Sequence, residues 1–213
     1  MNEEKDLLIK AAKNYLEQKY ARFHDEFELS HADFGDLFIL DQEFFFKSKK
    51  NPKFLVRVVH YQEDDEFNDN YLTLEYYDEF VSTMKEIVKD YFGNMVVVED
   101  YSGINDIYDL PANASLEEML CNGTRIPFEI IVDRLPANPG EFVDYLRAEL
   151  IKKSIRILSF AARTTEEAFD FSQEAIDIKM IPAKSQALNI SFDYKMGIER
   201  KFIENANFER TEI

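Results

Sequence analysis

The chain has 213 residues, one cysteine, and a formal net charge of −17 from 42 acidic against 25 basic side chains. Its length suits one large domain or two small ones, and its negative field repels phosphate backbones and anionic lipid headgroups. We therefore expect no direct nucleic-acid binding and favour a basic protein partner or a cation.

The first predicted element is a helix over residues 4–22, because apolar side chains recur at three-to-four spacing from Leu7 to Tyr20. Residues 23–30 then alternate between aromatic or aliphatic and polar side chains. Alternation of this kind predicts a strand with one solvated face.

Two short apolar runs follow at 36–41 and 43–48, before a turn at 48–53 that contains the breaker Asn51-Pro52. Residues 53–62 are apolar on both faces for most of their length, which is typical of a central strand. A long amphipathic helix is predicted from Leu74 to Phe92, with Gly93 where a left-handed helix cap belongs.

The second half of the chain predicts a further series of elements. A capping box of Ser115 and Glu118 starts a short helix that stops near Gly123, and a proline starts another helix at 139–155. Strands are expected at 94–102, 126–134, 156–162, 175–182 and 187–195. The tail at 203–213 has little periodicity, so we expect it to be loose.

This order of elements predicts an α+β fold with mainly antiparallel sheets and packed helices. A helix followed by about three strands occurs at 4–62 and again at 139–194. The repetition suggests two similar α-β-β-β halves, with subdomains at 1–93 and 94–213, although one single domain is the alternative.

The most acidic stretch, "VHYQEDDEFNDNYLTLE" at residues 59–75, follows a predicted strand and enters a predicted helix. Hard carboxylate oxygens suit Ca²⁺, and an EF-hand register can be started at Asp64. The residues at ligand positions are then Asp64, Glu66, Asn68 and Glu75. The sharp turn of that loop needs glycine where this chain has Asp69, so we interpret the run as a solvated turn with Asp69 or Asn70 capping the helix.

Other catalytic and metal-binding patterns are weaker. His31 and Asp33 with His60 superficially match the two-histidine, one-carboxylate iron site, but three ordinary histidines, including His24, are the interpretation we favour. The six glycines lie far apart in the sequence, whereas phosphate-binding loops need clustered glycines, so such loops are excluded. No G-x-S-x-G element is present. Cys121 has no cationic neighbour in sequence and is interpreted as a buried apolar group. We predict no cofactor.

Aromatic rings beside the acids suggest a protein-binding surface. Rings supply desolvated contact area and acids steer a basic partner. The candidate residues are Asp64, Asp65, Tyr71, Tyr76 and Tyr77. The alternative is that these rings belong to an aromatic-rich core in a chain without tryptophan.

The chain is expected to be soluble, because its N-terminus lacks the long apolar stretch of a signal peptide and the runs at 37–40 and 95–98 are too short to span a bilayer. As given, the sequence indicates a cytoplasmic protein without membrane insertion. An export signal removed ahead of Met1 would leave the same sequence and place the protein outside the cytoplasm.

Three segments together resemble a known group of proteins: "YLEQKYARFHDEFEL", "FLVRVVHYQ" and "DNYLTLEYYDEF". They are similar to segments of small uncharacterised α+β proteins of low-GC Gram-positive bacteria, often lipid-anchored outside the cell. The resemblance covers about residues 8–92. It implies no activity and favours a non-catalytic, surface-tethered role.

The leading hypothesis is a non-catalytic, acidic protein-interaction module. One alternative is a calcium-modulated protein or a hydrolase that depends on carboxylates. Another is an immunity-type inhibitor that imitates a polyanion.

The calcium alternative predicts a measurable stabilisation, because an ion that binds only the folded state at 100 times its Kd adds about 2.7 kcal/mol. For a chain of this size that raises the melting temperature by about 5 °C or more. Since the turn glycine is missing, we expect the melting temperature with millimolar Ca²⁺ to lie within about 1 °C of its value in EDTA, measured by thermal shift. A clear rise with Ca²⁺ would restore the metal interpretation.

Overall fold

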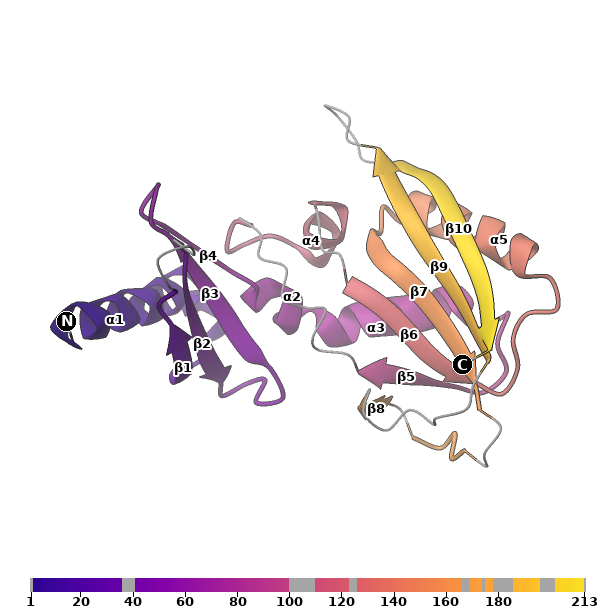
Figure 1. The fold of residues 1–213 in the computed structure, drawn as a ribbon, viewed down its shortest axis with the longest axis horizontal. Coiled ribbons are helices and arrows are strands. Elements are labelled where there is room, and N and C mark those ends of the chain that lie inside the picture. Colours follow the sequence, from indigo (N-terminus) through magenta and orange to yellow (C-terminus); the bar gives the residue numbers. More distant parts are fainter. Residues whose placement is uncertain are drawn as a thin grey trace. The chain divides into compact units, whose positions relative to one another are not determined.

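The protein is described by a computed structural model that covers residues 2–35, 41–99, 110–122, 126–165, 169–173, 175–177, 186–195 and 202–212. It confirms the α+β class, with helices and two mostly antiparallel sheets (Figure 1). The chain divides into two compact units. Unit 1 is Met1–Tyr76 with Asn105–Ala114, and unit 2 is Tyr77–Ile104 with Ser115–Ile213.

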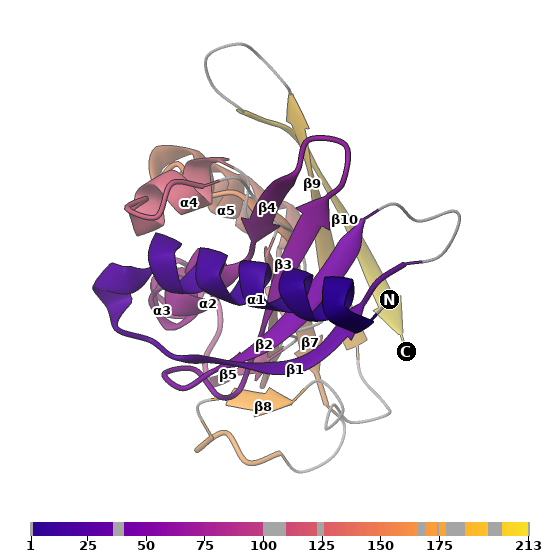
Figure 2. The ribbon, with the colours of Figure 1, turned by 90° about the vertical axis from the view of Figure 1, so that its left-hand side faces the viewer.

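Unit 1 is a four-stranded antiparallel meander with a helix on one face (Figure 2). Its elements are α1 (Asn2–Lys19), η1 (Ala21–Phe23), β1 (Phe27–Asp33), β2 (Gln42–Ser48), β3 (Leu55–Tyr61), β4 (Glu66–Asp69) and α2 (Tyr71–Glu75). The strand order β1-β2-β3-β4 places β3 inside the sheet, as its two-faced apolar sequence predicts.

The core of unit 1 follows from the alternation of side chains along its inner strands. Phe44 pairs with Val58 and Phe46 with Val56, and all four side chains are fully buried on one face. Helix α1 is buried through Ala12 and Leu16, two residues of the predicted stripe. A one-residue slip of β2 would turn these rings to the other face, so the pattern fixes the register.

Two boundaries in unit 1 differ from the sequence prediction. The first strand begins at Phe27 and not at residue 23, because the chain forms a 3₁₀ turn at Ala21–Phe23 and His24 then takes a left-handed φ of 51°. The second long helix, predicted over 74–92, is two helices that are separated at Tyr76. Most of the predicted apolar run at 36–41 lies outside the described residues.

Unit 2 contains a six-stranded mixed sheet in the order β10-β9-β7-β6-β5-β8. Its helices are α3 (Tyr77–Val88), α4 (Leu116–Asn122) and α5 (Pro139–Lys152). Its strands are β5 (Met95–Glu99), β6 (Ile126–Val132), β7 (Ile157–Thr164), β8 (Ala175–Asp177), β9 (Gln186–Lys195) and β10 (Phe202–Glu212). The parallel pair β6 and β7 is joined through α5, the crossover that parallel neighbours require.

Aromatic side chains fill the core of unit 2. Phe80 of α3 meets Phe128 of β6 edge to face at 6.0 Å, and Phe142 of α5 packs 5.3 Å from Phe160 of β7. Such ring pairs add about 0.5–1.5 kcal/mol each beyond the area they bury. The abundance of phenylalanine is therefore explained by the core.

The sheets of the two units differ in topology, since unit 1 is an antiparallel meander while unit 2 has a mixed sheet with a crossover. The units also divide at Tyr76, which places α3 in unit 2 and not in a subdomain that ends at residue 93. The tail is not loose, since β10 pairs antiparallel with β9 from Phe202 to Glu212.

The predicted helix ends have mixed outcomes. The capping box is confirmed, since Glu118 N donates to Ser115 Oγ at 3.2 Å and Ser115 N donates to Glu118 Oε2 at 2.7 Å. Gly93 is not a helix cap, because α3 ends at Val88. A Cβ at Gly93 would lie 2.8 Å from Asp133 Oδ2, which is the far end of an exposed side chain.

The register of β2 can be tested with neighbouring phenylalanines on opposite faces. Phe44→Ala removes a ring that is fully buried and should cost about 3–5 kcal/mol of unfolding free energy. Phe45→Ala removes a half-buried ring from the other face and should cost about 1 kcal/mol. Urea unfolding of both variants measures the difference, and equal losses would contradict the register.

Candidate functional site

The acidic run forms the tip of a β-hairpin. The sequence had instead predicted a loop between a strand and a helix. Strands β3 and β4 pair with Tyr61 opposite Glu66 and His60 opposite Phe67, and a turn at 62–65 joins them. We call residues 62–66 the acidic tip. Its carboxylates, which belong to Glu63, Asp64, Asp65 and Glu66, are all on exposed residues.

One anchor of the acidic tip is His60, a buried residue on β3. Its Nε2 lies 2.9 Å from Asp65 Oδ1, and its Nδ1 lies 2.9 Å from Gln42 Oε1 on β2. The imidazole ring stacks on Phe67 at 4.6 Å, and Phe67 in turn stacks on Tyr15 of α1 at 5.5 Å. The turn is therefore connected through side chains to the sheet and the helix.

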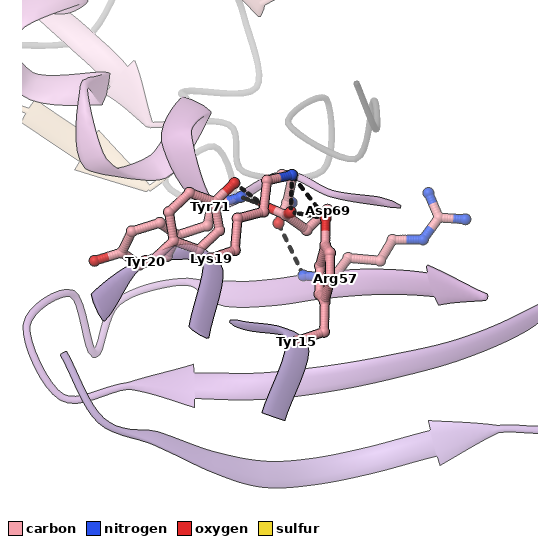
Figure 3. Close-up of polar contacts among 7 residues, drawn as sticks. Tyr15, Lys19, Tyr20, Arg57, Asp69 and Tyr71 are labelled. Carbon is pink, nitrogen blue, oxygen red and sulfur yellow. Dashed lines mark hydrogen bonds and ion pairs between the residues drawn. The ribbon is translucent and has the colours of Figure 1, made fainter. Parts of the chain in front are cut away.

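A second anchor is Asp69 at the end of β4, whose side chain is fully buried (Figure 3). Its Oδ2 accepts hydrogen bonds from Tyr15 Oη at 2.7 Å and from Lys19 Nζ at 2.9 Å. Its Oδ1 accepts from Tyr20 Oη at 2.7 Å and from the Tyr71 backbone N at 2.8 Å. A buried carboxylate is stable only when it is paired and hydrogen-bonded, and Asp69 satisfies both conditions.

The donors to Asp69 come from α1 and the residue that follows it, and from the first residue of α2. Tyr15 and Lys19 are four residues apart and so share one face of the helix, with Lys19 Nζ 2.7 Å from Tyr15 Oη. The Lys19 side chain is 15% exposed, so its ion pair with Asp69 is screened little by solvent. Arg57 is not the counter-ion, because its guanidinium points away from Asp69 and pairs with Glu43 (Figure 3).

The tyrosines at this anchor act as permanent donors. Burial, and then the negative charge of Asp69, raise the pKa of Tyr20 far above its ordinary value, so its hydroxyl keeps its proton. Burial, followed by the charges of Glu75 and Asp25, likewise raises the pKa of Tyr71. Neither phenol is available as a proton-transfer group at neutral pH.

The chain after Asp69 is fixed by Asn70. Its Oδ1 accepts from the Arg57 backbone N at 2.8 Å, and its own N donates to the Arg57 carbonyl at 3.3 Å. Asn70 is the N-cap residue of α2, but its side chain makes no capping bond there. Of the two caps expected from the sequence, it is Asp69 whose carboxylate accepts a backbone N–H at the start of α2.

The residues of the calcium register that was considered as an alternative lie on different elements. Asp64 lies in the turn, Glu66 and Asn68 lie on β4, and Glu75 ends α2. Glu75 accepts from Tyr71 Oη at 3.3 Å. Strand β4 occupies the centre of this register, where an EF-hand has a loop. Within the part of the chain that is described, no three histidine, cysteine, aspartate or glutamate side chains form a group that could hold a metal ion.

The expected partner surface is only partly exposed. Asp64 and Asp65 lie at the acidic tip, and the Asp65 side chain is 91% exposed. Tyr71 and Tyr77 are buried, and Tyr76 is half-buried with its hydroxyl donating to the Ala114 carbonyl at 3.1 Å. Tyr71 packs on Tyr20 at 4.5 Å. The placement of Tyr71 and Tyr77 on the surface is wrong, because their rings belong to the cores of their units.

The three histidines do not converge. His24 is exposed after η1, and His31 on β1 stacks on Phe45 at 4.3 Å. Phe45 and the buried Phe44 are neighbours on one strand and so face opposite sides of the sheet. His31 therefore lies on the face of the sheet opposite His60, and the two rings do not meet at one site. The side chain of Cys121 lies outside the described residues.

Comparisons with known proteins give a likeness in structure. No family model matches the chain, and no curated protein matches it. It is similar to the crystal structure of a DUF5037 family protein from Ruminococcus gnavus ATCC 29149, with 11% sequence identity and a TM-score of 0.43. The match covers 91% of this chain and 94% of that chain. None of the helices in the described part of the chain has the length and apolar character needed to cross a membrane.

The role of Asp69 can be tested by removing its charge. Asp69→Asn keeps the size of the side chain but leaves Lys19 without its counter-ion, so we expect a loss of about 3–5 kcal/mol in unfolding free energy. Asp64→Asn at the exposed tip is the matched control and should stay within about 0.5 kcal/mol of the wild type. Urea unfolding at pH 7 compares them, and equal stability of the two variants would rule out the buried anchor.

Proposed function

We propose that this chain is a non-catalytic protein-interaction module whose acidic tip contacts a basic segment of a partner protein. The observation that carries the proposal is the separation of the acids into two sets. Asp69 is buried and fully hydrogen-bonded, while Glu63, Asp64 and Glu66 are exposed at the end of the same hairpin. The buried acid orders the hairpin, and the exposed acids are free to meet a partner.

Electrostatic complementarity explains what such a tip can do. Several carboxylates on one short turn create a concentrated negative potential, which attracts lysine and arginine side chains and raises the rate of encounter. The net charge of −17 extends this attraction to longer range. Because the tip is exposed, the interaction should weaken strongly as salt is added.

The anchors contribute by limiting the motion of the tip before it binds. Tip residues are connected through His60 to β2 and through Phe67 to α1. A surface that is already ordered loses less conformational entropy on binding, which favours affinity. This arrangement supports recognition better than a flexible acidic tail would.

The proposal can be tested with a lysine- and arginine-rich peptide as the probe. Replacing Glu63 by glutamine and Asp64 by asparagine should weaken binding about five- to tenfold at low salt, since exposed ion pairs contribute about 0.2–1 kcal/mol each. The control variant replaces the exposed Asp78 and Glu79 of α3 by their amides, which removes the same charge elsewhere. Fluorescence anisotropy at several salt concentrations measures both.

The two double variants decide between local and general attraction. If the acidic tip is the binding surface, the α3 variant binds within about twofold of the wild type and the tip variant does not. Equal weakening of both would mean that net charge alone attracts the peptide. That result would reject the acidic tip as the interaction site.

A further inference from the structure

Four of the lysines in unit 1 lie close together at the end of a hairpin. They fall within residues 47–53, where β2 ends and the chain turns into β3. We call residues 47–53 the basic turn. Its lysines are all exposed, and they are Lys47, Lys49, Lys50 and Lys53. In a chain with a net charge of −17, such a group is a candidate contact for an anionic surface.

Hydrogen bonds hold the basic turn in one conformation. Asp25, ahead of β1, accepts from the Lys50 backbone N at 3.1 Å and from the Ser48 hydroxyl. Asn51 N donates to Ser48 Oγ at 2.9 Å, and Asn51 Nδ2 donates to the Leu74 carbonyl at 3.3 Å. Like the acidic tip, the basic turn is ordered before it meets a partner, so it loses little conformational entropy on binding.

Two lysines of the basic turn already contact acids of unit 1. Lys49 Nζ lies 2.6 Å from Glu26 Oε2, and Lys50 Nζ lies 3.9 Å from Glu75 Oε1. The Lys49 and Glu26 side chains are each 72% exposed. Ion pairs this exposed stabilise a fold very little, so their lysines can exchange one carboxylate for another at small cost. The basic turn is therefore available to carboxylates from outside the unit.

The basic turn and the acidic tip lie at opposite ends of one strand. The basic turn leads into β3 at Leu55, and the acidic tip follows β3 after Tyr61. Seven residues at about 3.3 Å each place the two ends about 20 Å apart. The two surfaces of one copy of unit 1 are thus too far apart to meet each other, whereas those of two copies can meet.

We propose that the acidic tip of one copy of this chain contacts the basic turn of a second copy. Charge complementarity carries this choice of partner, since the carboxylates of residues 62–66 then meet the lysines of residues 47–53. The contact is head to tail, so each copy can bind one neighbour at its tip and another at its turn. This inference rests on the proposed function, because it names the basic segment that the tip binds.

The net charge of −17 opposes contact between two copies at long range. At physiological ionic strength the Debye length is about 8 Å, so charges remote from the contact are largely screened while touching groups still attract each other. Because exposed ion pairs are individually weak, we expect a dissociation constant on the order of 0.1–1 mM. The association is thus reversible and depends on the protein concentration.

Charge reversal at the two ends tests the contact by sedimentation equilibrium in about 0.15 M salt. The tip variant carries Glu63→Lys with Asp64→Lys, and the turn variant carries Lys49→Glu with Lys53→Glu. Each variant has like charges at both ends, so each should associate at least about fivefold more weakly than the wild type. A chain that carries all four changes has its charges exchanged between the ends and should regain the association.

The matched control adds Asp78→Lys and Glu79→Lys on the exposed face of α3 to the turn variant, which gives it the same net charge as the four-change chain. This control should associate as weakly as the turn variant alone. Three results would overturn the proposal: no self-association of the wild type, no recovery in the four-change chain, or equal recovery in the control.

Amide shifts of the wild type provide a second measurement if a variant fails to fold. Between about 0.05 and 1 mM protein, the amides of residues 62–66 and those of the basic turn should shift together. Shifts confined to one of the two surfaces would reject the head-to-tail contact. A chain that binds the basic peptide through its tip but does not bind itself would keep the proposed function and lose this inference.

Discussion

The structure of unit 1 depends on one buried charge, the carboxylate of Asp69. An ionised group away from water costs several kcal/mol unless an opposite charge and hydrogen bonds compensate it. Here the compensation comes from Tyr15 and Lys19 on α1, from Tyr20 just after it, and from the backbone N–H of Tyr71 at the start of α2. Because these donors belong to separate elements, the charge is satisfied only when the last turn of α1, the end of β4 and the start of α2 are all in place.

Acids that are close together in the sequence therefore have two roles: Asp69 is a buried anchor, and Asp64 and Asp65 are exposed at the tip. Side chains alternate along β4, so Phe67 and Asp69 face α1 and the core. The turn then carries the carboxylates of Asp64 and Asp65 into solvent. His60 connects the two roles, since its ring stacks on Phe67 and lies within hydrogen-bond distance of Asp65. Order at the buried anchor thus extends to the exposed tip.

The sequence predicted the elements whose signals are local. The two-faced apolar run of β3 and the capping box at Ser115 are short-range patterns, and both are confirmed. The burial of Asp69 was not predicted, because its partner Lys19 is 50 residues away and no local pattern joins them. The four-residue strand β4 was missed for a related reason, since an acidic segment is strand-like only beside β3. One usable signal was overlooked: the Tyr15 and Lys19 pair, which presents two donors on one helix face.

A double-mutant cycle between Lys19 and Asp69 tests the central claim most directly. Each single change, Lys19→Met or Asp69→Asn, leaves one charge buried without its partner, while the double variant leaves neither. We expect the double variant to lose at least about 2 kcal/mol less unfolding free energy than the sum of the single losses. Losses that add within about 0.5 kcal/mol would mean that the two charges do not interact and would contradict this account.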